Sequence, residues 1–166
     1  MCAEEEKMAA DPVTPPLKFT TIAEHFNPAW FAAVMGTAVI PLALSFLDFP
    51  FAKGLAAFFV LAAVAIFLLA LAPWTAKLFL FRERVREDLN HPVTAHFLST
   101  MPISLVLLAG DLLRFPDLFL PAGATRALAF WLWLPGSLGI YVFGYLILFR
   151  VFRNKGISPA HANFGW

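Results

Sequence analysis

The chain has 166 residues, of which 60% are hydrophobic and only 14% are charged, and its mean hydropathy is +0.75. A water-soluble domain of this size could not bury so much apolar surface, so the composition predicts a protein whose solvent is lipid. The net charge of +1, without a basic stripe, gives no reason to expect a nucleic-acid partner, and the single cysteine, Cys2, excludes a disulfide framework.

The first 24 residues are polar and lack the basic start and apolar stretch of a secretory signal, so we expect a disordered tail. Four runs without Asp, Glu, Lys or Arg follow, at residues 25–47, 54–76, 89–110 and 127–149. Each run has 22 or 23 residues, enough for a helix to cross the roughly 30 Å hydrocarbon layer of a bilayer. The sequence therefore predicts an all-α, polytopic membrane domain over residues 25–166 with four membrane-spanning helices.

Short connections at residues 48–53 and 114–125 predict two antiparallel helical hairpins, at about 28–81 and 92–152. Nine of the twelve Lys and Arg residues lie in the N-terminal tail, in the link at 77–88 or after residue 149, and three lie at the hairpin tips. Because basic loops stay in the cytoplasm, we expect both termini and this link on the cytoplasmic side of an inner or plasma membrane.

Three helices are predicted to share a start pattern, in which an Asn is followed by a Pro or a Trp. At the first helix the Asn can cap the helix, and the Pro takes the first helical position, where a missing N–H has no cost. The pattern recurs at the third helix and again in the last residues, where it predicts the start of a fifth helix. The residues of this helix-start motif are Asn27, Pro28, Trp30, Asn90, Pro92 and Asn163. The repeat indicates an array of similar hairpins, although these residue types are also common wherever a helix enters a membrane.

Residues that could carry chemistry are sparse. We find no pair of carboxylates, phosphate-binding loop or nucleophile–base arrangement, so no enzyme activity and no cofactor are predicted. The four histidines have no spacing that suits a metal, and we expect them to be interfacial or capping residues.

The first and third helices each combine a proline with small hydroxyl residues. A proline frees a backbone carbonyl, which lipid tolerates only where the bend faces protein or water. We therefore expect these helices inside the protein, with the second and fourth outside. The candidate pore-lining residues are Gly36, Thr37, Pro41, Ser45, Thr100, Pro102 and Ser104. Alternatively, the hydroxyls bond to carbonyls of their own helix. Glycines of the fourth helix are expected to allow close helix packing.

Two charged residues fall at predicted helix ends. Lys77 can extend its ammonium group to the membrane interface. Asp111 can pair with Arg114, three residues further along the helix. We interpret both as interfacial charges.

The stretch Asn27-Pro28-Ala29-Trp30, followed by Met35-Gly36-Thr37, resembles the first helix of the tellurite-resistance/dicarboxylate transporter family. Residues 90–93 and 159–166 are similar to the starts of its third and fifth helices. The resemblance implies a trimer in which odd-numbered, bent helices line a pore. It also implies transport of small anions of the C4-dicarboxylate (malate), tellurite, sulfite, nitrate or chloride class.

The same resemblance implies a truncated N-terminal portion, with about four of the family's ten helices and without the later helix that carries its gate. Ala38 also stands where the family commonly has a second glycine. A rival from another class is a non-transporting membrane scaffold or assembly subunit, in which the polar faces serve helix packing. We expect the 166 residues alone to insert into a membrane without conducting anions.

Overall fold

The computed structural model describes residues 18–48, 50–91, 94–116 and 119–153, and within these ranges it contains helices and no strands. The all-α prediction is confirmed. The helices are α1 (Phe19–Glu24), α2 (Trp30–Leu44), α3 (Ala52–Leu80), α4 (Arg82–Asn90), α5 (Thr94–Phe97), α6 (Thr100–Arg114) and α7 (Ala122–Arg153).

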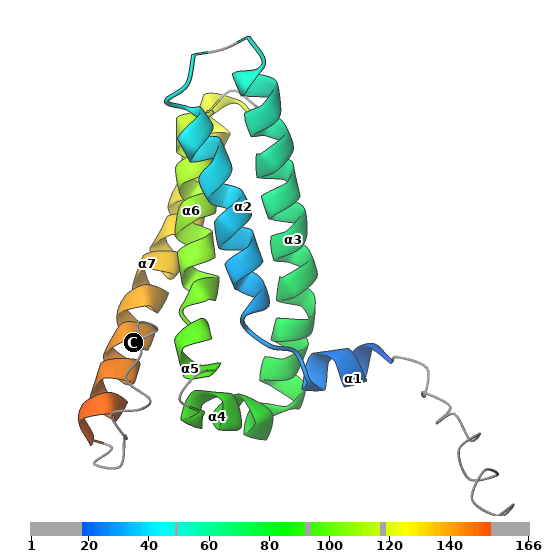
Figure 1. The fold of residues 1–166 in the computed structure, drawn as a ribbon, viewed down its shortest axis with the longest axis vertical. Helices are drawn as coiled ribbons and strands as arrows, with labels where there is room; N and C mark the ends of the chain where they lie inside the picture. The colour runs from blue at the N-terminus through cyan, green and yellow to red at the C-terminus, as the bar shows by residue number, and fades with distance from the viewer. Residues whose placement is uncertain (1–17, 49, 92–93, 117–118, 154–166) are drawn as a thin grey trace, which may run out of the picture.

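Helices α2, α3, α6 and α7 run lengthwise beside one another, and the short helices α1 and α4 lie across one end (Figure 1). The closest neighbours are α2 with α3, α2 with α6, and α6 with α7, so α2 and α6 occupy the middle of the layer. The crosswise helices α1 and α4 lie at the end where α2 begins (Figure 1), which we call the α4 end. The opposite end, where α2 and α6 finish, we call the far end.

Three stretches are long and apolar enough to cross a membrane: Ala52–Leu80, Thr94–Arg114 and Ala122–Phe149. The chain is therefore an integral membrane protein. The predicted first span is shorter than expected, because α2 has 15 residues and covers only about 22 Å at 1.5 Å per residue. Its charge-free run continues at both ends as turns, which the absence of charge alone cannot distinguish from helix.

Two elements lie outside the predicted spans. Residues 19–24, expected to belong to a tail, form α1, whose Ala23 is fully buried. The basic link between the predicted hairpins forms α4. Residues 1–17 and 154–166, with the predicted fifth helix, lie outside the described residues.

The interior of the layer is made of small and aromatic side chains between α2, α3 and α6. Phe31 of α2 is fully buried and packs against Phe67 of α3, with ring centroids 5.8 Å apart. Alanines let the helices approach closely where they cross. In contrast, α3 and α7 expose many large apolar side chains, for example Leu69 at 75% and Tyr141 at 77%. This surface suits lipid, as expected for the second and fourth predicted helices.

The crossing of α6 and α7 depends on two glycines. A Cβ atom at Gly136 would lie 2.9 Å from the backbone oxygen of Pro102, and one at Gly139 would lie 2.7 Å from the Pro102 Cβ. No atom lies within 4 Å of a Cβ built at Gly144. The prediction of close packing is therefore confirmed at Gly136 and Gly139, and Gly144 has no such contact within the described residues.

We expect Gly136→Ala to lower the free energy of unfolding in detergent by roughly 1–3 kcal/mol, as overpacking typically does. The backbone oxygen of Pro102 cannot rotate away as a side-chain end could. Gly144→Ala, in the same helix, should instead leave stability unchanged or raise it by up to about 1 kcal/mol. Denaturant-induced unfolding of both variants measures the difference, and equal effects would contradict the packing argument.

Candidate functional site

The contact between α2 and α6, which we call the seam, contains two of the predicted pore-lining hydroxyls. Thr100 Oγ1 donates to the carbonyl oxygens of Phe97, at 2.5 Å, and Pro28, at 3.3 Å. Ser104 Oγ donates to those of Thr100, at 2.8 Å, and Phe31, at 3.1 Å. Ser104 thus bonds to its own helix, and Thr100 bonds to the last residue of α5; both bonds lie within the predicted third helix, as the alternative interpretation expected. Each hydroxyl also lies within bonding distance of a carbonyl in the first turn of α2 or just before it. The two side chains join the helices at the α4 end.

The remaining candidates divide between buried and open positions. Pro41 and Pro102 are fully buried. On α2, Thr37 Oγ1 donates to the carbonyl of Ala33 at 2.8 Å, and Ser45 Oγ donates to that of Leu42 at 2.7 Å. Gly36 is exposed, and no atom lies within 4 Å of a Cβ built on it. The structure thus gives α2 an open face at Gly36, flanked by Thr37, while the buried candidates hold helices together.

The structure of the helix-start motif of α2 differs in detail from the prediction. Asn27 Oδ1 accepts a hydrogen bond from the amide of Ala29 at 2.9 Å, which forms an Asx turn before the helix, and the N-cap of α2 is Ala29 and not Asn27. The helix itself begins two residues later than predicted, at Trp30, because Pro28 and Ala29 form a turn. Pro28 is fully buried, and Trp30 is 63% exposed, as suits an aromatic residue at a membrane interface.

At the next motif, a histidine takes the place expected for an asparagine. Asn90 is the last residue of α4, and Thr94 is the first of α5. His91 Nδ1 accepts a hydrogen bond from the Thr94 amide at 3.2 Å and lies 3.1 Å from its Oγ1. A capping role is therefore confirmed for His91, three residues before the group it caps. Pro92 and Asn163 lie outside the described residues.

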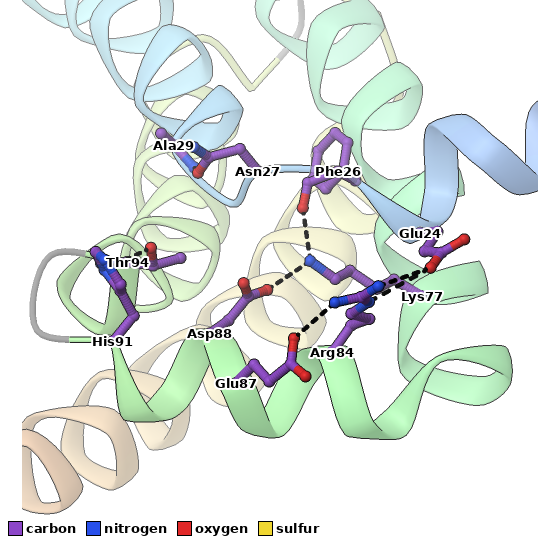
Figure 2. A network of polar contacts seen from close by, with 10 residues as sticks. All are labelled: Glu24, Phe26, Asn27, Ala29, Lys77, Arg84, Glu87, Asp88, His91 and Thr94. Carbon is purple, nitrogen blue, oxygen red and sulfur yellow. Dashed lines mark hydrogen bonds and ion pairs between the residues drawn. The ribbon is translucent and has the colours of Figure 1, made fainter. Parts of the chain in front are cut away.

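A buried lysine organises the α4 end (Figure 2). Lys77 of α3 is 3% exposed; its Nζ donates to the Phe26 carbonyl at 2.9 Å and to Asp88 Oδ2 at 2.6 Å. Lys77 is therefore held inside the protein and does not extend to solvent. The link before α2 and the crosswise α4 both fold over the end of α3, so the ammonium group finds its acceptors inside the protein.

A second group of charges lies beside it (Figure 2) and is more exposed to solvent. Arg84 contacts Glu87 at 3.0 Å and Glu24 at 3.3 Å, and so connects α4 to α1. These carboxylates, with Glu87 the stronger influence, raise the pKa of Arg84 above its ordinary value. The Arg84 side chain is 48% exposed, so solvent screening leaves these pairs little stabilising effect.

These side chains surround a cavity of about 230 Å³. Its charged lining consists of three carboxylates, one ammonium and one guanidinium group, so the fixed charges nearly cancel. The lining residues are Glu24, His25, Phe26, Asn27, Lys77, Arg84, Glu87, Asp88 and Thr94. An anion would find no excess positive charge here, and the cavity is better described as the solvated edge of the Lys77 network.

Asp111, at the far end of α6, does not form the predicted pair with Arg114. Both of its carboxylate oxygens are buried, and neither has a hydrogen-bond partner among the described residues. The Arg114 guanidinium donates instead to the Ser45 carbonyl at 3.1 Å. The spacing of three residues is suitable for an ion pair, but the Arg114 guanidinium bonds to a carbonyl at the end of α2 instead.

Metal ligands do not gather in the described part of the chain, where no group of three or more His, Cys, Asp or Glu side chains could hold an ion. The polar groups that do meet are helix-joining hydroxyls, the Lys77 network and the solitary Asp111. None of these sets pairs a nucleophile with a base.

Comparisons with known proteins agree on one family. The family model described as "SLAC1: Voltage-dependent anion channel" matches residues 25–166. Two proteins of Methanocaldococcus jannaschii, both named uncharacterized transporters, are 29% identical over 147 residues and 27% identical over 146 residues. These matches cover 87% and 86% of this chain but 40% of each relative, so the chain spans less than half the length of the curated relatives it matches. No solved structure matches.

Proposed function

Because the chain belongs to the SLAC1 family of voltage-dependent anion channels, we propose that it forms part of a membrane path for small anions. The observation that carries the proposal is the open face of α2. A helix that is short, contains a proline and exposes Gly36 is suited to a water-filled interior rather than to lipid. The resemblance of this same stretch to the family's first helix supports the assignment.

The path would run along the Gly36–Thr37 face of α2. Without a fixed positive charge, selectivity would come from backbone dipoles and hydroxyl groups, which can replace part of the water around an anion. Thr100, Ser104 and Pro41 would act indirectly by fixing how α2 sits against α6. The ions we propose are those of the C4-dicarboxylate, tellurite, sulfite, nitrate or chloride class, passing down their gradient.

The assembly we propose is a trimer in the inner or plasma membrane, with both termini and α4 in the cytoplasm. The support for this orientation is the excess of Lys and Arg in the tail, in the α4 link and after residue 149. The Lys77 network would then lie at the cytoplasmic mouth of the path, where it fixes the beginning of α2.

The test is anion flux into liposomes that contain the full-length product of the gene encoding these residues. We expect anion-selective flux from the wild type and at least a tenfold loss in Gly36→Trp, because an indole would fill the open face. Leu69→Trp, on the lipid-facing side of α3, is the matched control and should conduct normally. Flux that is absent from the wild type, or unaffected by Gly36→Trp, would refute the proposed path.

One observation favours the rival function of a non-transporting scaffold. The hydroxyls of Thr100 and Ser104 are already bonded to carbonyls within the seam, as they would be in a protein whose polar faces only join helices. The same flux measurement separates the two functions, since a scaffold would fold but would give no flux of any anion tested.

A further inference from the structure

Asp111 is a buried charged residue at the far end, and it has no function in the proposed anion path. It is 0% exposed, and its two oxygens have no hydrogen-bond partner among the described residues. An ionised carboxylate without a partner is strongly disfavoured in a protein interior. Its charge must therefore be compensated by something other than the side chains seen around it.

The nearby charged side chains do not supply this compensation. Between Trp30 and Leu44, α2 has no titratable residue. At this end α3 and α7 contribute only Lys53 and Arg126, both exposed, and the nearest charge on α6 itself, Arg114, is exposed and bonded to Ser45. The link after α2 adds Asp48, which is exposed and carries the wrong sign.

The packing of the two helices places a second oxygen near Asp111. They run in the same direction, because Ser104 meets Phe31 near one end and Arg114 meets Ser45 near the other. Asp111 follows Ser104 by seven residues and so lies on the same face of α6. A Cβ built at its neighbour Gly110 lies 3.9 Å from the Leu42 side chain, so Asp111 lies near the turn of α2 that contains the fully buried Pro41. Proline has no N–H to donate to the carbonyl four residues earlier, which belongs to Thr37. A carboxylate and a freed carbonyl between two helices are the groups that bind Na⁺ or H⁺ in membrane proteins.

We propose that Asp111, together with the backbone carbonyl freed by Pro41, binds one small monovalent cation, a proton or a sodium ion, between α2 and α6. As a proton site, Asp111 is a neutral acid that donates a hydrogen bond to the carbonyl. As a sodium site, the carboxylate and the carbonyl are both ligands. The proposal concerns the described residues alone and holds whether or not the chain conducts anions.

Infrared spectroscopy of the purified chain in liposomes tests this directly, in choline buffer and then in sodium buffer at the same pH. A bound proton gives a carboxylic-acid C=O band that disappears in Asp111→Asn. Bound sodium instead gives carboxylate bands that shift when sodium replaces choline, and this shift is also absent from Asp111→Asn. Either result supports the cation site and identifies its occupant.

Two further variants are controls for the assignment of these bands to Asp111. Asp48→Asn removes an exposed acid from the same end and should leave both signals intact. Asp111→Glu keeps a carboxyl group, so the assigned band should move in frequency rather than vanish, which identifies Asp111 even if Asp111→Asn folds poorly. A wild-type spectrum with neither an acid band nor a sodium-dependent shift assignable to residue 111 would overturn the proposal.

Discussion

Lys77→Met is expected to destabilise the protein strongly, because the lysine is buried and holds two groups at the α4 end. The methionine cannot donate, so the Phe26 carbonyl and the Asp88 carboxylate both lose a partner at once. Removing one member of a buried ion pair typically costs about 3–5 kcal/mol. Because the Asp88 side chain is 20% exposed, water can partly replace the lost ammonium, and we expect a value near the lower end of that range.

A double-mutant cycle separates the pair from the lysine's other contact. Asp88→Asn should cost less than Lys77→Met, since the ammonium keeps the Phe26 carbonyl, and the double variant should be less destabilised than the sum of the two. Arg84→Gln is the control, because its ion pairs also involve α4 but are solvent-exposed. Unfolding in detergent measures all four variants. If Lys77→Met were no worse than Arg84→Gln, the buried network would not hold the α4 end together.

The sequence predicts the long helices because their signal is local. A run of 22 or 23 residues without charge is itself the reason a segment enters lipid, so α3 and α7 fall where expected. The predicted third helix is divided into α5 and α6 by a turn at residues 98–99. Helix ends were less predictable: α2 stops at Leu44 although its apolar run continues. The crosswise helices α1 and α4 contain charged residues, so a search for charge-free runs cannot find them.

The roles of single polar residues were less predictable, since they depend on contacts distant in sequence. Lys77 reaches a carbonyl 51 residues away, and a rule about lysines near helix ends cannot anticipate that partner. Asp111 and Arg114 have the spacing of an ion pair, yet Arg114 bonds to the Ser45 carbonyl and Asp111 has no hydrogen-bond partner among the described residues. Likewise, only the contacts with Pro102, Leu105 and Val106 of α6 distinguish the crowded Gly136 from the open Gly144.

The open face of α2 also leads to a prediction about anion flux. When residues 1–166 are produced alone and reconstituted into liposomes, we expect insertion without measurable anion flux. Trp30–Leu44 packs against α3 and α6, but no described residue covers the Gly36 side of α2. In the 166 residues alone this side would face lipid, although a pore needs further protein there to enclose the water-filled path.

Gly36→Leu should then make this segment more stable or less prone to self-associate, because a leucine suits lipid better than exposed backbone does. The same substitution should reduce flux in the full-length gene product, where that face would line the path. Flux and detergent unfolding are measured for both proteins. Reproducible anion-selective flux from the wild-type 166 residues would contradict the expectation, and would mean that copies of this segment complete a pore among themselves.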